Sequence, residues 1–191
     1  YTAYREKYAG AAETGGFARQ IEAEDADVRS SSVISLNMDR SGPEVSPSDP
    51  VLLKVNTLGG SGWAQPGQYA SWTVTVPRSG WYTLQMRYRQ NSARGRAVYR
   101  RLYINGEIPF REAEALPFRF SDEWQTAYLG GDEPYWFYLK EGDNSIRLET
   151  SLGGYTQVIA KADETARALG TLYREIVLIT GQNPDANRDY M

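Results

Sequence analysis

The chain has 191 residues, 41% of them hydrophobic and 24% charged, and this composition predicts a packed domain rather than a disordered segment. A formal net charge of −3 argues against nucleic acid as the main partner. The absence of cysteine and histidine excludes thiolate chemistry, a serine–histidine pair and the common zinc ligands. Aromatic residues reach 13%, which suits an all-β fold and also suits sugar binding.

The first part of the chain is expected to lead into a β domain. Tyrosines at helical spacing predict a short helical lead-in within 1–16, which a pair of glycines ends. Alternating apolar and acidic residues predict a strand over 18–26. The proline- and serine-rich stretch 41–50 is expected to be a loop, followed by a short strand over 51–55.

The clearest pattern in the chain is a pair of alternating segments, 68–77 and 79–88. In the first, Trp72 and its alternate neighbours share an apolar face, while Thr73 and its alternate neighbours share a polar one. A period of two predicts half-buried strands. The turn at 77–80 is expected to join the two segments into an antiparallel sheet.

Further strands follow at short spacing. One is expected over 97–104, with Val98, Arg100, Leu102 and Ile104 on one side. Asn105-Gly106 predicts a hairpin turn with a return strand over 108–110. Residues 113–123 are interpreted as a proline-containing connection. Three more strands are predicted, over 124–129, 134–140 and 145–150, and Glu141–Asn144 is expected to form the turn between the last two.

The tail changes to a helical period. Apolar residues three and four apart predict a helix over 155–180; the alternative is a helix to Ala168 and a final strand over 172–179. We therefore expect a mainly β chain: a jelly-roll-like antiparallel β-sandwich with a C-terminal α-helix and a short N-terminal helix. The expected divisions are 1–16, 17–154 and 155–191.

Several motifs occur in the order typical of one family of β-sandwiches. They are Ile21–Glu24, Gly62-Trp63, Gly67–Tyr69, Trp72–Pro77, Gly80–Leu84, Trp124–Thr126 and Glu141–Leu148. Together they resemble carbohydrate-binding modules of families 6 and 35, with galactose-binding-domain-like folds. The resemblance covers about 21–152.

A closer likeness is to a module of long extracellular solute-binding proteins of bacterial sugar ABC transporters. It rests on segments such as 98–101, 106–110 and 179–181, and on the tail after Leu152. This resemblance implies a non-catalytic piece of a secreted, lipid-anchored parent lipoprotein at the cell surface. The chain begins at Tyr1 without methionine, which we interpret as a fragment. Its partners would be the remaining domains of that parent and an oligo- or polysaccharide, with membrane contact only through an anchor outside this chain.

Family 6 places its sugar platform on residues that match Trp63 and Trp124 here, and the matching motifs add Tyr69 and Gln125 as candidates. An indole offers a flat apolar face to a pyranose, and polar neighbours bond its hydroxyls. Trp63 could equally anchor its glycine-rich loop, and Trp124 could be buried in a strand. The asparagine that completes the family 6 site has no match, because the predicted helix occupies that place.

Two carboxylates, Glu22 and Glu24, match residues that help hold a structural calcium ion in these modules. Calcium takes six to eight oxygen ligands, several of them carboxylate. The remaining acidic ligand is unclear, with Glu175 the best candidate. The alternative is that both glutamates are solvated charges on a strand.

An enzyme is not expected. Acidic pairs such as Asp122 with Glu123 and Asp132 with Glu133 could flank a glycosidic bond, but they lie in polar, loop-like surroundings that do not raise a carboxyl pKa. The alternatives to a binding module are a spacer domain without a sugar site and an accessory module of a polysaccharide-degrading enzyme. Most members of a basic cluster are expected to line a solvated loop, with a phosphate or anion site as the alternative; the cluster is Arg87, Arg89, Arg94, Arg96, Arg100 and Arg101.

Overall fold

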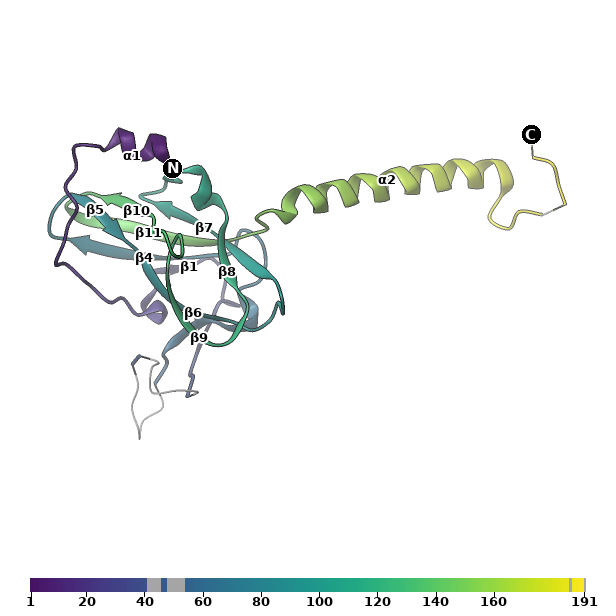
Figure 1. Cartoon of the computed structure of the whole chain (residues 1–191). Helices are drawn as coiled ribbons and strands as arrows, with labels where there is room; N and C mark the ends of the chain where they lie inside the picture. Colours follow the sequence, from purple (N-terminus) through teal and green to yellow (C-terminus); the bar gives the residue numbers. More distant parts are fainter. Residues whose placement is uncertain (41–45, 48–53, 186, 191) are drawn as a thin grey trace. The chain divides into compact units, whose positions relative to one another are not determined.

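The computed structural model describes residues 1–40, 46–47, 54–185 and 187–190. The chain forms two compact units, Tyr1–Gly153 and Gly154–Met191. The first holds the strands, and the second holds one long helix, α2 (Tyr155–Thr180) (Figure 1). The predicted mainly β class is confirmed, with antiparallel sheets, a C-terminal helix and a short N-terminal helix, α1 (Thr2–Lys7).

One layer of the β unit is a five-stranded antiparallel sheet in the order β1-β4-β11-β7-β8. The bounds are β1 (Val28–Arg29), β4 (Tyr69–Val76), β11 (Gly142–Ser151), β7 (Ala97–Ile104) and β8 (Leu116–Arg119). The predicted alternation holds in β4, where Trp72, Val74 and Val76 are buried and Thr73 and Thr75 are exposed. The side-chain period of two therefore predicted correctly which side chains of β4 face the core.

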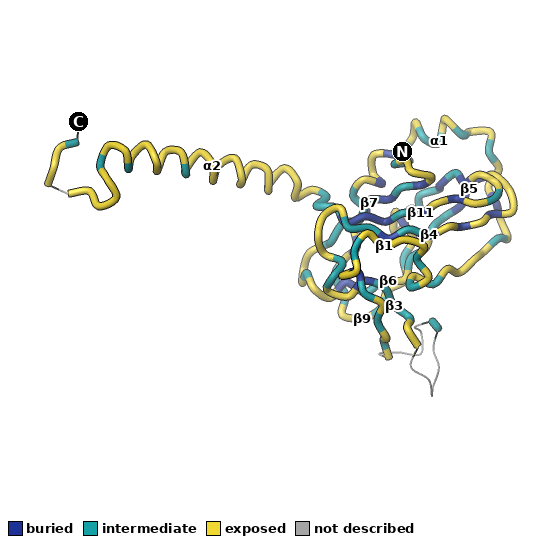
Figure 2. The backbone as a smooth tube through the Cα atoms, turned by 180° about the vertical axis from the view of Figure 1, so that it is seen from behind, coloured by how far each residue is buried: buried dark blue, intermediate teal, exposed yellow. Residues whose placement is uncertain are grey.

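Shorter antiparallel pairs face that sheet or border it. They are β10 (Trp136–Leu139) with β5 (Gly80–Thr83), β6 (Gln85–Gln90) with β9 (Ser121–Tyr128), and β2 (Ser35–Asn37) with β3 (Thr57–Gly59). Side chains from both layers, such as Phe137 and Leu102, form one core cluster. Figure 2 shows the buried residues concentrated in strands such as β4, β5 and β11. Three 3₁₀ turns complete the unit: η1 (Ala23–Asp25), η2 (Gly60–Gly62) and η3 (Arg111–Glu114).

The predicted pairing of 68–77 with 79–88 is wrong. Strand β4 pairs with β1 and β11, whereas β5 pairs with β10, so the turn at 77–80 passes from one layer to the other. The second segment is also divided at Leu84 into β5 and β6. Alternation identified strands here but not partners, because pairing depends on contacts distant in sequence.

Other boundaries also differ. No strand spans 18–26; the chain makes the η1 turn there, and Ala23 O accepts the indole N–H of Trp72 at 3.0 Å. The loop predicted over 41–50 lies outside the described residues except 46–47, and the strand predicted over 51–55 lies outside them except 54–55, which are not strand.

Around the hairpin, Asn105 and Gly106 take the positive φ values of 52° and 84° that such a turn requires. The return strand over 108–110 reduces to one bridge between Ile104 and Glu107. The expected connection 113–123 instead contains β8, which tolerates Pro117 because it lies at the edge of its sheet.

The helix α2 spans 26 residues, which confirms the helical prediction and excludes the alternative final strand over 172–179. No residue of α2 is buried. Within the described residues, no helix has the length and hydropathy needed to cross a bilayer.

Candidate functional site

The indole of Trp63 is half-buried and anchors the loop that follows η2. Its Nε1 donates to Gln68 O at 3.1 Å, and the Arg100 guanidinium lies 4.8 Å from the ring centroid. On the backbone side, a Cβ built at Gly59 would lie 3.1 Å from Cε3 of the ring. The geometry favours the loop-anchor interpretation of Trp63 over an open sugar platform.

Arg100 is a residue whose role the sequence analysis missed. It lies on the inward face of β7 with Leu102, and it donates to Trp63 O at 3.0 Å. Burial lowers the pKa of its guanidinium to about 10. The strand pattern placed Arg100 on one side with apolar residues, and the structure shows that it is one of the cluster's members that do not line a solvated loop.

Trp124 lies on β9 in a polar cluster. Its Nε1 donates to Asp39 Oδ2 at 3.2 Å, and Arg89 Nη2 lies 2.6 Å from the same oxygen. The Arg89 guanidinium also lies 5.1 Å from the indole centroid. Trp124 is half-buried, so part of its ring is accessible beside a carboxylate and a guanidinium.

The two indoles belong to separate clusters, and no ring contact joins Trp63 to Trp124, both of which are described. Gln125 follows Trp124 on β9, so its side chain points to the other side of the strand. Its Oε1 accepts the Tyr88 hydroxyl at 3.1 Å. The candidate residues therefore do not converge on one surface.

Tyr69 lies on the outer face of the five-stranded sheet. Arg147 stacks between two tyrosines there, with its Cζ 3.8 Å from the ring of Tyr69 and 4.5 Å from that of Tyr103. The buried carboxylate of Glu149 pairs with Arg147 and, at 3.1 Å, with Arg101. Arg101 therefore belongs to an ion-pair network and does not line a solvated loop. Arg89 is likewise ion-paired, with Asp39. Arg94 and Arg96 lie after β6 and are exposed.

The Glu22–Asp25 turn contains a buried carboxylate. Both side-chain oxygens of Glu24 are buried, and they find no partner among the other described residues. Burial raises the pKa of Glu24, although its own backbone N–H opposes this, and the charges of Glu22 and Asp25 raise the pKa further. An orphaned carboxylate beside a second one fits a hard cation such as calcium.

Within the part of the chain that the structure describes, side chains do not form the rest of the expected calcium shell. Among the described residues, no three acidic, histidine or cysteine side chains converge, and Glu175 lies in α2. Glu22 itself accepts hydrogen bonds from Gln20 and Ser46, both at 2.8 Å. Carbonyl oxygens and water could supply further ligands to a cation here.

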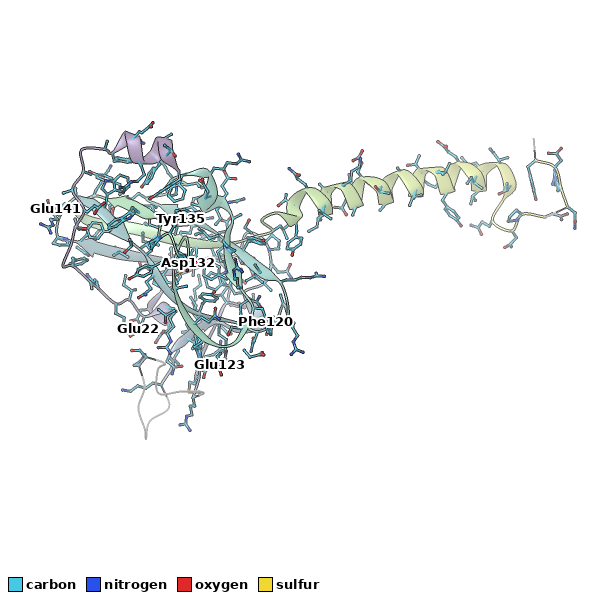
Figure 3. The ribbon with its side chains drawn as sticks, in the orientation of Figure 1. Glu22, Phe120, Glu123, Asp132, Tyr135 and Glu141 are labelled. Carbon is cyan, nitrogen blue, oxygen red and sulfur yellow. The ribbon has the colours of Figure 1, made fainter. Side chains whose placement is uncertain are left out.

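The carboxylates considered for hydrolysis are all exposed. Glu123 lies on β9 and Asp132 in the loop before β10, and both are labelled in Figure 3. Asp122 and Glu133 are exposed as well. An exposed carboxylate lacks the apolar surroundings that a general acid requires.

Comparison with solved structures defines the class of fold. The chain is similar to a family 35 carbohydrate-binding module from Clostridium thermocellum, at 23% identity and a TM-score of 0.50 over 69% of this chain and 85% of that one. It is also similar to part of a cycloisomaltooligosaccharide glucanotransferase from Paenibacillus sp., at 24% identity and a TM-score of 0.52. That match covers 72% of this chain but only 16% of the glucanotransferase.

The β unit therefore has the galactose-binding-like fold of family 35 carbohydrate-binding modules. No protein-family profile matches the sequence, and no curated protein does.

Proposed function

We propose that the β unit is a non-catalytic carbohydrate-binding module whose ligand is an oligo- or polysaccharide. The observation that carries this proposal is the half-buried indole of Trp124, held by Asp39 and lying beside Arg89. A pyranose could stack its C–H face on the indole while its hydroxyls bond to these polar neighbours. The fold shared with family 35 modules supports the proposal.

Replacing Trp124 with alanine is expected to weaken oligosaccharide binding by roughly tenfold or more, because the stacking surface is lost. Isothermal titration calorimetry with a panel of oligosaccharides measures the binding. Tyr128→Ala is the matched control, since Tyr128 is an exposed aromatic residue on the same strand.

Trp63→Ala should instead lower the melting temperature, because it removes a loop anchor. Failure of every sugar at millimolar concentration, or unchanged binding by Trp124→Ala, would refute this site.

The parent of this module is proposed to be an extracellular, lipid-anchored solute-binding protein for ABC-type sugar uptake. This parent is supported by the segments 98–101, 106–110 and 179–181, which resemble segments of a module found in such solute-binding proteins. A second candidate is an accessory module of a polysaccharide-degrading enzyme, favoured by the similarity to part of the glucanotransferase chain. Sequencing the gene around this segment distinguishes them, because only the second parent carries a catalytic domain.

We also propose that Glu24 and Glu22 help to hold calcium. Without the ion, the raised pKa of Glu24 means that its protonated form stabilises the fold. This contribution is fully present below the pKa of the unfolded state and is lost as the pH rises through the higher folded value. In chelator, the Glu24 carboxyl should therefore contribute less to the free energy of unfolding at pH 7 than it does near pH 4.

Calcium is expected to raise the melting temperature at pH 7, and Glu24→Gln should abolish this rise while stabilising the chelated protein. Differential scanning calorimetry with calcium and with chelator measures both effects. Glu123→Gln, which changes an exposed carboxylate, is the control and should leave the response intact. Identical melting curves with calcium and with chelator would contradict the site.

A further inference from the structure

The apolar face of α2 keeps a strict seven-residue repeat. Its members alternate three and four residues apart along the helix, and we call them the seam: Tyr155, Val158, Ala162, Thr165, Leu169, Leu172, Ile176 and Ile179. A repeat of seven in a helix of 3.6 residues per turn drifts by about 20° per heptad, and a partner helix in a left-handed supercoil follows this drift along the whole seam. The large members of the seam are exposed, including Leu169 at 61% and Ile179 at 66%.

The seam distinguishes between partner orientations by the size of its residues. In a parallel pair each residue faces its own copy, so Ala162 would meet Ala162 and Thr165 would meet Thr165, which leaves a thin middle. In an antiparallel pair centred near Arg167, Ala162 faces Leu172 and Thr165 faces Leu169 of the other copy. Each small residue then faces a large one, which fills the core evenly.

The charges beside the seam favour the same arrangement. Lys161 and Glu175 both occupy the position just before a seam residue, and such positions face each other across an antiparallel pair. With the same centre, Lys161 of one helix comes opposite Glu175 of the other, twice by symmetry. Ile159 and Tyr173 each directly follow a seam residue, and they come opposite each other on the other side of the seam. Both are exposed.

From this complementarity of size and charge we propose that α2 is a dimerisation helix, and that its partner is α2 of a second copy of this chain in antiparallel orientation. The interface would be an isologous one, since the same surface serves both chains. Val177 and Leu178 lie outside the seam, and Leu178 is 85% exposed. The proposal does not depend on a sugar site.

The first test is the oligomeric state of the 191-residue chain by sedimentation equilibrium. A dimer is expected, and Leu172→Ser should raise its dissociation constant by roughly tenfold or more, because a seam leucine is lost. Leu178→Ser makes the same change outside the seam and should leave the dimer unchanged. A monomer at every concentration, or equal effects of the two substitutions, would overturn the proposal; the seam would then be covered by another part of its own chain.

The second test measures orientation, which the absence of cysteine makes straightforward. Ala168→Cys places a thiol next to its symmetry mate only in the antiparallel pair, whereas Ile179→Cys does so only in a parallel pair. Oxidation should therefore cross-link Ala168→Cys and not Ile179→Cys. The combined charge exchange Lys161→Glu with Glu175→Lys should restore a dimer that either single exchange weakens. The opposite cross-linking result would exclude the antiparallel arrangement.

Discussion

The substitution Asn144→Asp is expected to destabilise the β unit by roughly 3–5 kcal/mol, although it replaces a single heavy atom. Asn144 is fully buried. Its Nδ2 donates to Lys140 O at 2.7 Å and to Gly142 O at 3.1 Å. A carboxylate oxygen in that position would face two carbonyl oxygens with nothing to donate, and burial would penalise its charge as well.

The other side of the Asn144 amide joins two turns. Its Oδ1 accepts from Lys140 N at 3.1 Å and from Asn105 Nδ2 at 3.0 Å, and Asn105 Oδ1 in turn accepts from Ser145 N at 2.9 Å. Loss of the Asn144 hydrogen bonds would therefore also weaken the hairpin turn after β7, a strand that pairs with β11 in the sheet. Cooperative networks of this kind lose more than one hydrogen bond when one member fails.

Urea unfolding measures the effect, and the neighbouring Asp143 supplies the control. Asp143→Asn makes the reverse exchange on an exposed side chain that accepts one hydrogen bond from Thr75, at 2.6 Å. It should cost about 1 kcal/mol or less. If Asn144→Asp were as mild as Asp143→Asn, the buried amide would not hold these turns together.

Asn144 also shows what the sequence could predict. The Glu-Gly-Asp-Asn string indicated a turn before the last strand, and a turn is indeed closed there by the Asn144 side chain. The prediction did not extend to burial, because the partner Asn105 is 39 residues away. Local chemistry predicted the turn, and only the folded sheet brings the two asparagines together.

The candidate site divides in the same way. Trp63 and Trp124 could be identified from their motifs, since large aromatic residues at fixed places in a β pattern are conspicuous. Asp39, which holds the Trp124 indole, is 85 residues away in sequence. Nothing local marks it as a partner, so the polar half of the cluster could not be predicted.

Arg100 was missed for a different reason. Its strand was predicted correctly, and the period of two already placed it with Leu102 on one face. A cluster of arginines in sequence was taken as a solvated surface, although the alternation contradicted this for Arg100. Where composition and periodicity disagree within a strand, periodicity is the better guide to burial.

The tyrosine spacing predicted a helical lead-in at the N-terminus, and in the structure this segment packs against the sandwich. Tyr1 and Tyr4 use their hydroxyls to accept the N–H groups of Trp136, at 2.8 Å, and of Tyr138, at 3.0 Å. These N–H groups point outward from β10, an edge strand. The tyrosines thus satisfy donors that would otherwise be free to pair with another strand.

The same segment covers Trp81, which lies next to Tyr82 on β5 and so points to the opposite face of that strand. Trp81 N donates to Ala12 O at 2.9 Å, and Thr14 N donates to Trp81 O at 3.1 Å. The rings of Tyr4 and Tyr8 pack edge-on against the indole at 5.6 and 5.9 Å. Trp81 is consequently only 2% exposed.

Deletion of residues 1–14 is therefore expected to cost on the order of 3–5 kcal/mol, because it exposes Trp81 and leaves the β10 edge unpaired. Tyr4→Phe isolates the hydroxyl: it keeps the ring packing and removes one acceptor, at a cost of about 1–2 kcal/mol. Burial raises the pKa of Tyr4 to about 12, so the phenol stays protonated at any pH used for the experiment.

Thermal unfolding and light scattering measure these effects, with Glu6→Ala as the control, since Glu6 lies on α1 but is exposed. Aggregation should increase in the deletion variant, because an open strand edge with neighbouring aromatic rings favours pairing between chains. If the deletion melted like the intact chain, residues 1–14 would be an appendage. The edge of β10 would then need another explanation for remaining unpaired.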